Sequence, residues 1–203
     1  CEDIDPVRFI ANRATGKMGF AIAQDALARG ADVILVCGKS PLDPPPGVKF
    51  VPVWGAQEMC EVMQQYQPIC DIIIGAAAVG DFRIKTIAEQ KLKKSENASE
   101  ELVLTLTGTT DILKTLGQNK KPAQVMVGFA AETENIITNA KKKLESKNLD
   151  FIVANDVTME GAGFASDTNI VTFISRNGDI ESLPKMSKQD VATAILDKVV
   201  KLL

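Results

Sequence analysis

The stretch with the clearest chemical potential is residues 5–19, DPVRFIANRATGKMG, which runs directly into a helix-like sequence, FAIAQDALARG. Its residues that suit anion binding are Arg8, Asn12, Gly16, Lys17 and Gly19. A helix start presents free backbone N–H groups and the positive end of the helix dipole, so it favours an anion such as phosphate. The glycines allow the backbone to approach a ligand closely. An ordinary loop with a helix cap is the simpler interpretation, and the density of polar residues weighs against it.

Two familiar phosphate-binding motifs do not fit this stretch. A Walker A loop needs a glycine five residues before the Gly-Lys pair, and Ala11 stands there. The dinucleotide fingerprint needs a glycine where Ala14 stands, so Gly16 and Gly19 form only half of it. An NAD(P)-dependent oxidoreductase stays open as an alternative. It would need an acidic residue after its second strand, where residues 37–39 read Cys-Gly-Lys.

The bulk composition predicts a single globular domain spanning residues 1–203. The chain is 45% hydrophobic with a formal net charge of −3, and its length allows a good core. A mildly acidic chain argues against general binding to nucleic acids or membrane surfaces. No apolar run is long enough to cross a membrane, and no signal peptide is visible.

Histidine and cysteine usage restricts the chemistry. The chain has no histidine, which excludes Ser-His-Asp and Cys-His catalysis and histidine-ligated metal sites. Any chemistry must therefore use carboxylates, lysines, amides, backbone dipoles or a metal. The four cysteines, Cys1, Cys37, Cys60 and Cys70, lack a paired metal-binding spacing. We therefore predict a reducing, cytoplasmic compartment.

Alternating helical and strand-like patterns must position these residues. Helices are expected at 17–29, 56–66, from 109 or 110 to 117, at 134–147 and from 188 onward. Strands are expected at 31–37, 48–53, 71–75, 102–106, 123–129, 150–154, 169–175 and 180–183. The pattern predicts an α/β fold, a Rossmann-like, doubly wound, mostly parallel sheet with helices on both faces. Asn177-Gly178 predicts a β-hairpin near the C-terminus. Residues 1–16 read as loop, and the first strand of the fold is expected before Cys1.

Several polar or aromatic residues follow the expected strands, where ligands of such sheets bind. They are Asn12, Asp81, Lys91, Phe129, Lys143, Lys147 and Asn155. Each alone has an ordinary explanation as a helix cap, a solvated charge or a turn residue. The lysine-rich segment 85–100 is too poor in apolar residues to bury itself, so we expect it to be a mobile flap.

Together these motifs resemble a known family. DPVRFIANRATGKMGFAIA, GAAAVGDF, KLKK at 91–94, GFAAET and the run from Lys143 to Asp156 resemble phosphopantothenate–cysteine ligase, in order, from about residue 5 to the last helix. The resemblance implies a CTP-dependent reaction of coenzyme A synthesis. The carboxylate of 4′-phosphopantothenate would attack the α-phosphorus of CTP, and L-cysteine would then displace CMP from the acyl-cytidylate. It also implies fusion to a flavin-dependent decarboxylase in the full-length chain.

Residue roles follow from the same resemblance. Asn12, Lys91 and Arg8 would act in the reaction, with Arg8, Asn12 and Ala77 binding the substrate. Asp81 would bind the metal, Mg²⁺. The nucleotide-binding residues would be Thr15, Gly16, Lys17, Gly19, Gly75, Ala76, Ala77, Asp81, Phe129, Lys143 and Lys147. The physical chemistry agrees, because lysines and helix N–H groups are what a triphosphate needs.

The chain departs from the family pattern at three places. The Gly-Pro-Thr turn is absent before Cys1, Thr109-Thr110-Asp111 replaces Asn-Pro-Asp, and Gly80 replaces an alanine. A non-catalytic regulatory subunit on the same fold is a further alternative, but it would be expected to lose Asn12 or Lys91.

The resemblance also implies a homodimer with the active site near the interface. The apolar 169–183 hairpin is more than a sheet of this size needs to close itself, and an exposed hairpin edge favours pairing with another chain. Arg8 could then reach the neighbour's phosphopantothenate phosphate.

Overall fold

The structure is a computed structural model, and it describes residues 1–93, 101–132, 135–156 and 166–203. A central five-stranded sheet forms the body of the molecule. Its strands are β5 (Ile72–Gly75), β8 (Val125–Glu132), β9 (Phe151–Asp156), β11 (Val171–Ser175) and β12 (Ile180–Ser182). The spatial order is β12-β11-β9-β8-β5, with β5, β8 and β9 parallel and the β11–β12 hairpin antiparallel. The mostly parallel α/β fold expected from the sequence is confirmed.

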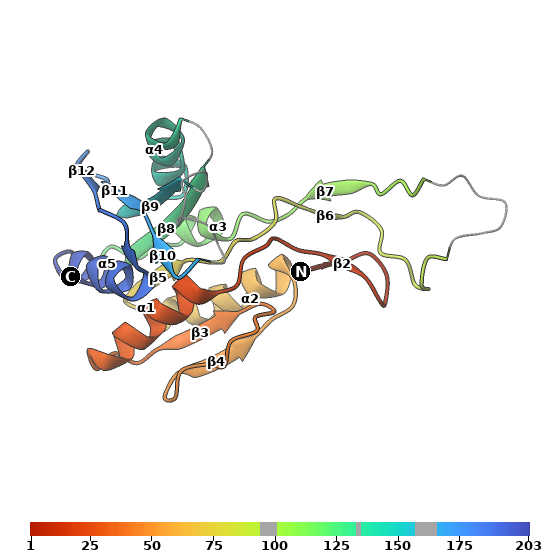
Figure 1. Cartoon of the computed structure of the whole chain (residues 1–203), viewed down its shortest axis with the longest axis horizontal. Coiled ribbons are helices and arrows are strands. Elements are labelled where there is room, and N and C mark those ends of the chain that lie inside the picture. The colour runs from red at the N-terminus through yellow and green to blue at the C-terminus, as the bar shows by residue number, and fades with distance from the viewer. Residues whose placement is uncertain (94–100, 133–134, 157–165) are drawn as a thin grey trace.

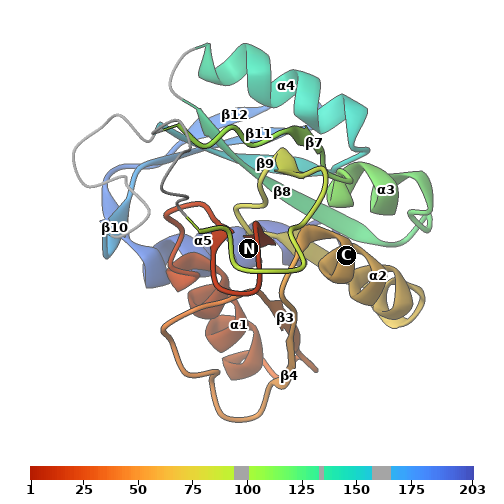
Figure 2. The same cartoon turned by 90° about the vertical axis from the view of Figure 1, so that its right-hand side faces the viewer.

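The helices cover both faces of this sheet, as predicted (Figure 2). They are α1 (Lys17–Ala28), α2 (Ala56–Tyr66), the 3-10 turn η1 (Gln67–Ile69), α3 (Ile112–Gln118), α4 (Ile136–Ser146) and α5 (Lys188–Val200). Helices α1 and α5 pack on one face through a core that contains Val127, Phe151 and Ile195. On the opposite face α3 and α4 enclose a second core around Met126 and Leu116. Successive residues of β8 and β9 point into opposite cores, so these strands are apolar on both faces.

A second, two-stranded parallel sheet contains β3 (Ile34–Cys37) and β4 (Lys49–Pro52). It is not hydrogen-bonded to the central sheet within the described residues, so the single continuous sheet expected from the sequence is not found there. The strand at 31–37 was expected to be buried, but every residue of β3 is only partly buried. Within the described residues β3 pairs with β4 alone, and neither strand contributes to the two apolar cores of the central sheet.

The N-terminal residues form a hairpin instead of the loop expected at 1–16. Strands β1 (Glu2–Asp3) and β2 (Phe9–Ile10) pair antiparallel. Beside them runs a second antiparallel pair, β6 (Phe82–Ile84) and β7 (Leu106–Gly108). We call residues 82–93 and 101–108 the arm, because this segment projects away from the body (Figure 1). The expected strand at 102–106 is therefore shorter and displaced toward the C-terminus.

Other element ends agree with the sequence or shift slightly. The hairpin turn is confirmed, with Gly178 at φ +95°, and Ser187 Oγ caps α5 by accepting from the Asp190 N–H at 3.0 Å. The cap of α3 is Asp111, not Thr109 or Thr110, and its carboxylate accepts from the Lys114 N–H. Strand β8 continues to Glu132 instead of ending at 129.

Two short strands, β10 (Thr168–Asn169) and β13 (Met186–Ser187), pair beside α5. Part of the expected flap, residues 94–100, lies outside the described residues. Across the parts of the chain that the structure describes, no helix combines the length and apolarity needed to cross a membrane.

Candidate functional site

The start of α1 lies against the loop that follows β5. Gly16 precedes the helix with φ +84°, a left-handed conformation that favours glycine, and no side chain caps the helix there. A Cβ on Gly19 would lie 3.9 Å from the Cβ of Ala76. Thr15 is fixed through its carbonyl, which accepts from Ser40 Oγ at 3.0 Å. The predicted anion-binding residues at 15–19 therefore adjoin the predicted residues 75–77.

Asn12 joins the same cluster. Its Nδ2 donates to the carbonyl of Ala78 at 2.9 Å, and the side chain is exposed to solvent. The amide is thus held at the carboxyl end of β5, within reach of a ligand lying on that loop. The structure thus brings Asn12 to the loop that contains Ala76 and Ala77, about 65 residues further along the chain.

The structure gives Gly75 a packing role that sequence reasoning missed. A Cβ there would come within 2.7 Å of Leu113 Cδ2 on α3. Gly128, the β8 residue paired with Gly75, would likewise crowd Leu149 and Leu113. Both glycines let α3 and its neighbours pack closely on the sheet, and Phe129 packs against the α1–α5 core. The residue types at these positions therefore have structural reasons independent of any ligand.

Residues 109–111 connect the end of the loop after β5 with Lys147. The backbone N–H of Thr109 donates to the Asp81 carbonyl at 2.9 Å, and Thr109 Oγ1 donates to the carbonyl of Gly80 at 2.5 Å. Asp111 follows, and its carboxylate pairs with Lys147 Nζ at 3.1 Å. Because Asp111 caps α3, Lys147 neutralises a carboxylate at a helix start. An anionic ligand could replace that carboxylate as the partner of the lysine.

The backbone around Lys147 is fixed by a close approach. A Cβ on Gly117 would lie only 2.1 Å from the Lys147 carbonyl oxygen. Asn148, at φ +54°, donates from Nδ2 to the Gly117 carbonyl at 2.9 Å. Lys143 lies one turn earlier on α4 and is partly buried. The packing of α3 on the end of α4 thus positions both predicted lysines.

Asp81 is the predicted metal ligand, and its side chain is exposed. Within the described residues, no group of three cysteine, aspartate or glutamate side chains could hold a metal ion. Mg²⁺ usually keeps several waters and takes one or two carboxylates together with substrate phosphates. A single aspartate beside a phosphate site fits that pattern.

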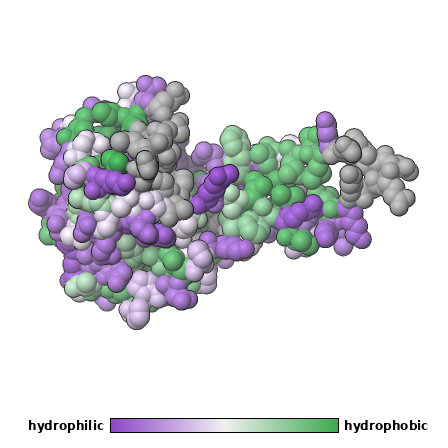
Figure 3. Space-filling model, in the orientation of Figure 1, coloured by the Kyte–Doolittle hydropathy of each residue, from purple (hydrophilic) through white to green (hydrophobic). Residues whose placement is uncertain are grey.

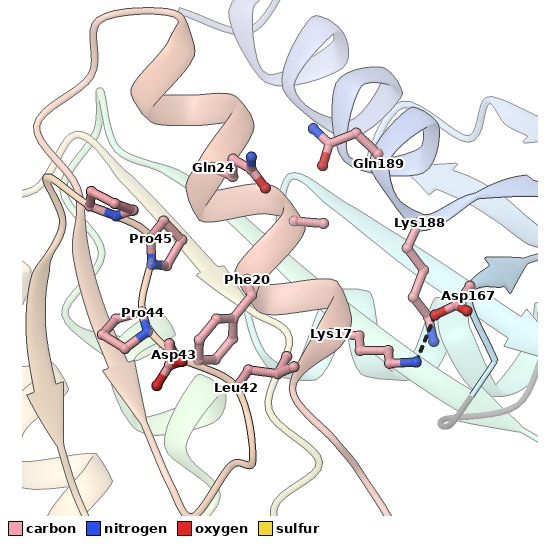
Figure 4. Close-up of a pocket in the computed structure, with 12 residues that line it drawn as sticks. Lys17, Phe20, Gln24, Leu42, Asp43, Pro44, Pro45, Asp167, Lys188 and Gln189 are labelled. Carbon is pink, nitrogen blue, oxygen red and sulfur yellow. Dashed lines mark hydrogen bonds and ion pairs between the residues drawn. The ribbon is translucent and has the colours of Figure 1, made fainter.

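A cavity of about 630 Å³ lies between α1, the loop at 42–46 and the start of α5 (Figure 4). Its wall includes Phe20 and the prolines at 44–46, and its charged end holds Lys17, Asp167 and Lys188. Lys17 Nζ lies 2.6 Å from Asp167 Oδ1. Lys188 is 7% exposed and donates to the Ser166 carbonyl.

Burial lowers the pKa of Lys188, the nearby Lys17 cation lowers it further, and Asp167 opposes the shift. The hydrogen bond from Lys17 lowers the pKa of Asp167. Sequence reasoning missed Asp167 and Lys188. The only signal at 188 was its place directly after the helix cap Ser187, which indicates a helix start and no binding role.

Arg8 and Lys91 form a separate group on the hairpin and the arm. Arg8 donates from Nε and Nη2 to Asp5 at 3.0 and 2.5 Å, and from Nη2 to the Leu92 carbonyl at 2.6 Å. Lys91 is exposed. Arg8 is held against the arm at Leu92, whereas Asn12 is held against the body at Ala78, so the predicted residues fall into two groups. One lies on the body around Asn12, and the other lies along the arm.

The fold and the polar residues at the carboxyl ends of its strands define a Rossmann-like α/β domain of the ligand-binding type. Comparison with known proteins then gives the family. The chain belongs to the DNA/pantothenate metabolism flavoprotein C-terminal domain family, which it matches over residues 1–203.

Two curated relatives and one solved structure illustrate the match. The chain is 50% identical over 202 residues to the coenzyme A biosynthesis bifunctional protein CoaBC of Bacillus subtilis, covering 99% of this chain and 49% of that protein. It is 44% identical to a cysteine/cysteine sulfinic acid decarboxylase of an unknown prokaryotic organism, covering 99% of this chain and 55% of the relative. The crystal structure of the C-terminal domain of CoaBC superimposes with a TM-score of 0.82 at 42% identity, covering 98% and 88% of the two chains. The chain therefore spans about half the length of these curated relatives.

Proposed function

We propose that this chain is a phosphopantothenate–cysteine ligase module that uses CTP to join 4′-phosphopantothenate to L-cysteine in coenzyme A synthesis. The observation that carries the proposal is the contact of Asn12, which lies between β2 and α1, with the loop after β5, beside the start of α1. Family membership and the similarity to CoaBC support it. The absence of histidine suits a reaction that depends on positioning and charge neutralisation.

The proposed reaction has two steps. The carboxylate of phosphopantothenate attacks the α-phosphorus of CTP, the bond to the β-phosphate breaks, and pyrophosphate leaves with the electron pair. The amine of cysteine then attacks the acyl carbon, CMP leaves as the C–O bond breaks, and the amine proton passes to solvent. Lys17, Lys143 and Lys147 balance the phosphate charge in this scheme, and bound Mg²⁺ would supply further neutralisation at Asp81.

Asn12 has the clearest role in this scheme. Its amide can donate to an acyl or phosphate oxygen, whereas a carboxylate cannot donate and would repel an anionic intermediate. Asn12→Asp should therefore release pyrophosphate but accumulate the acyl-cytidylate. Asn119→Asp, at an exposed asparagine after α3, is the matched control and should behave as the unsubstituted protein.

The test is pyrophosphate release with phosphopantothenate, comparing CTP with ATP, followed by addition of cysteine. Product formation by Asn12→Asp at the unsubstituted rate would contradict its role. No release with either nucleotide would contradict the proposed function. A thermal-shift comparison of CTP with NADPH tests the oxidoreductase alternative. That alternative needs an acidic residue at the end of its second strand, but Cys37 ends β3 and the Lys39 ammonium that follows lies 4.6 Å from the centre of the Phe9 ring.

We also propose a homodimer that forms through the arm. The apolar part of the case for an interface at the 169–183 hairpin is weakened, because Val171, Phe173 and Ile174 are buried in the chain's own cores, although β12 is the exposed edge strand of the central sheet. Exposed apolar side chains gather instead on the arm (Figure 3). They are Phe82, Ile87, Leu102, Val103 and Leu106. A second copy would cover them and carry Arg8 and Lys91 of one chain toward Asn12 of the other.

Light scattering tests the dimer, which should have about twice the 21.8 kDa mass of one chain. Val103, 85% exposed on the arm, and Ile69, 73% exposed on the body, form a matched pair. Val103→Asp should give a monomer, while Ile69→Asp should remain a dimer. A fully active monomer of the unsubstituted chain would contradict both the dimer and the shared site. The proposal has three further parts. The chain is fused to a flavin-dependent decarboxylase in a longer protein, it acts in the cytoplasm, and Lys91 acts from a flap.

A further inference from the structure

The carboxylate of Asp5 is the most densely hydrogen-bonded side chain of the hairpin. It is fully buried, with no exposed side-chain surface. Oδ1 accepts from the backbone N–H groups of Val7 and Arg8 at 2.8 and 2.9 Å. Oδ2 accepts from Arg8 Nε and Nη2 and from the backbone N–H of Leu92 at 3.1 Å. Such a fully partnered carboxylate can stay ionised away from water, and the hydrogen bond from Arg8 holds the pKa of Asp5 well below its usual range.

These contacts close a ring between the hairpin and the arm. Leu92 donates its N–H to Asp5, and its carbonyl accepts from Arg8 Nη2 at 2.6 Å. The Ala88 N–H donates to the Ile4 carbonyl at 3.0 Å, so a second hydrogen bond joins the hairpin to the arm four residues before Leu92. We call the Asp5–Arg8–Leu92 ring the latch. Lys91 directly precedes Leu92, so the latch fixes the backbone on which Lys91 stands.

The latch orients two cations at once. The Arg8 guanidinium is gripped along its Nε–Nη2 edge, while the side chain remains 43% exposed. Its remaining edge can therefore meet a ligand in a fixed orientation, as a planar guanidinium needs for phosphate. Lys91 is exposed one residue from the Leu92 contact. An apolar residue at position 5 could fill the space but could hold neither cation.

We propose that Asp5 is a positioning residue, whose buried carboxylate aims Arg8 and the segment carrying Lys91 at the phosphorylated substrate. This inference rests on the proposed ligase function. It assigns Asp5 no contact with substrate. Its role is to hold the two long cationic side chains in place before the substrate binds, so that they lose less conformational entropy on binding.

The test compares Asp5→Asn with Asp25→Asn in the full chain. Asp25 is the matched control, because it also pairs with an arginine, Arg29 at 2.9 Å, but lies on α1 away from the arm. Asp5→Asn should raise the KM for phosphopantothenate about tenfold or more, while the KM for cysteine stays within about twofold. Arg8→Gln should also raise it, and the effect of the double variant should be clearly smaller than the two single effects combined, because both substitutions break one unit. Asp25→Asn should match the unsubstituted protein.

A second readout does not need activity. Hydrogen exchange of a peptide covering residues 85–93 should be faster in Asp5→Asn than in Asp25→Asn, with an unchanged rate for the central sheet. Faster exchange with unchanged kinetics would show a purely structural latch and overturn the proposal. Equal losses in every kinetic constant, or additive effects in the double variant, would also overturn it. If the unsubstituted protein releases no pyrophosphate, the ligase function fails first and the positioning role fails with it.

Discussion

The central sheet and the arm are both built from strands, but different forces hold them. In the sheet, β8, β9 and β11 pair with neighbours on both sides, and their side chains fill two apolar cores. In the arm, β6 and β7 pair over three residues each, and Phe82 and Leu106 on them are exposed. The arm is attached to the hairpin through the polar contacts of Asp5 and the Ala88–Ile4 hydrogen bond, and Ile84 on β6 is buried beside it, so apolar burial in the arm is small compared with the two cores of the body.

This difference in what holds the two regions indicates which of them a ligand or a partner could order. Apolar burial contributes stability over many residues at once, so the sheet unfolds as a unit. A few hydrogen bonds to one carboxylate can be broken without disturbing the sheet. The arm is therefore the part of the molecule whose order binding can change at low cost, and it carries two of the predicted site residues, Lys91 directly and Arg8 through the latch.

The largest expected effect comes from truncating the sheet core. Phe151 is fully buried and meets the Phe173 ring edge-on, with ring centres 5.8 Å apart. Phe151→Ala should reduce the free energy of unfolding by about 3–5 kcal/mol. Val103→Ala on the arm should change it by less than about 0.5 kcal/mol, with both variants measured by urea unfolding at a protein concentration low enough for the chain to be monomeric. Similar losses in the two variants would mean that the arm is as tightly packed as the body.

A second, smaller effect compares a glycine in each region. Gly117→Ala places a Cβ against the Lys147 carbonyl, so backbone must move. Over-packing costs about 1–3 kcal/mol and the gain in helix propensity returns about 1 kcal/mol. Because the contact at 2.1 Å is with backbone, the cost lies near the upper end of that range, and we expect a net loss of about 2 kcal/mol, with an unchanged m-value. Gly108→Ala, on the arm with no heavy atom within 4 Å of its Cβ position, should have no resolvable effect. Equal urea midpoints for the two variants would contradict the close approach.

The sequence predicts the body better than the arm, because the body is built from elements with local sequence signals and the arm is held by contacts between residues far apart in the chain. The continuous apolar runs of β8 and β9 and the caps and turns at Ser187 and Gly178 leave local signals that need no distant partner. The latch leaves none, because Asp5 meets Leu92 only after the chain has passed through β3, β4 and β5. Short strands such as β1 and β2 are too brief for a periodic pattern.

The site shows the same division. The start of α1 and the loop after β5 could be found from residue types, and their contact follows from the parallel sheet. Asp167 and Lys188 could not, because the contacts that place them join distant segments: Asp167 pairs with Lys17, 150 residues away, and Lys188 donates to the Ser166 carbonyl. The exposed apolar face of the arm was also missed, because its residues are separated by the lysine-rich stretch and form no run.

The smallest expected effect is the pH dependence of the latch. The hydrogen bond from Arg8 lowers the pKa of Asp5 relative to the unfolded chain, where an aspartate titrates near about 4. The unfolded state then binds more protons between the two pKa values, so the contribution of Asp5 is complete above about pH 4 and is lost as the pH falls through the folded-state pKa. The sheet cores contain no buried carboxylate among the described residues and should not share this dependence.

Trp54, the single tryptophan, can report on the latch. It packs edge-on against Phe9 of the hairpin, with ring centres 5.3 Å apart. On acidification, tryptophan emission should change before the far-ultraviolet circular dichroism of the body does. Asp3 accepts a hydrogen bond from the indole, so the reference for the emission change is Asp5→Asn, in which the latch is already broken at neutral pH and this contact is retained. If the unsubstituted protein and Asp5→Asn give the same acid titration of emission, Asp5 does not hold the arm. If emission and circular dichroism change together in both, the arm and the body are one cooperative unit, because a separately held arm would have to respond first.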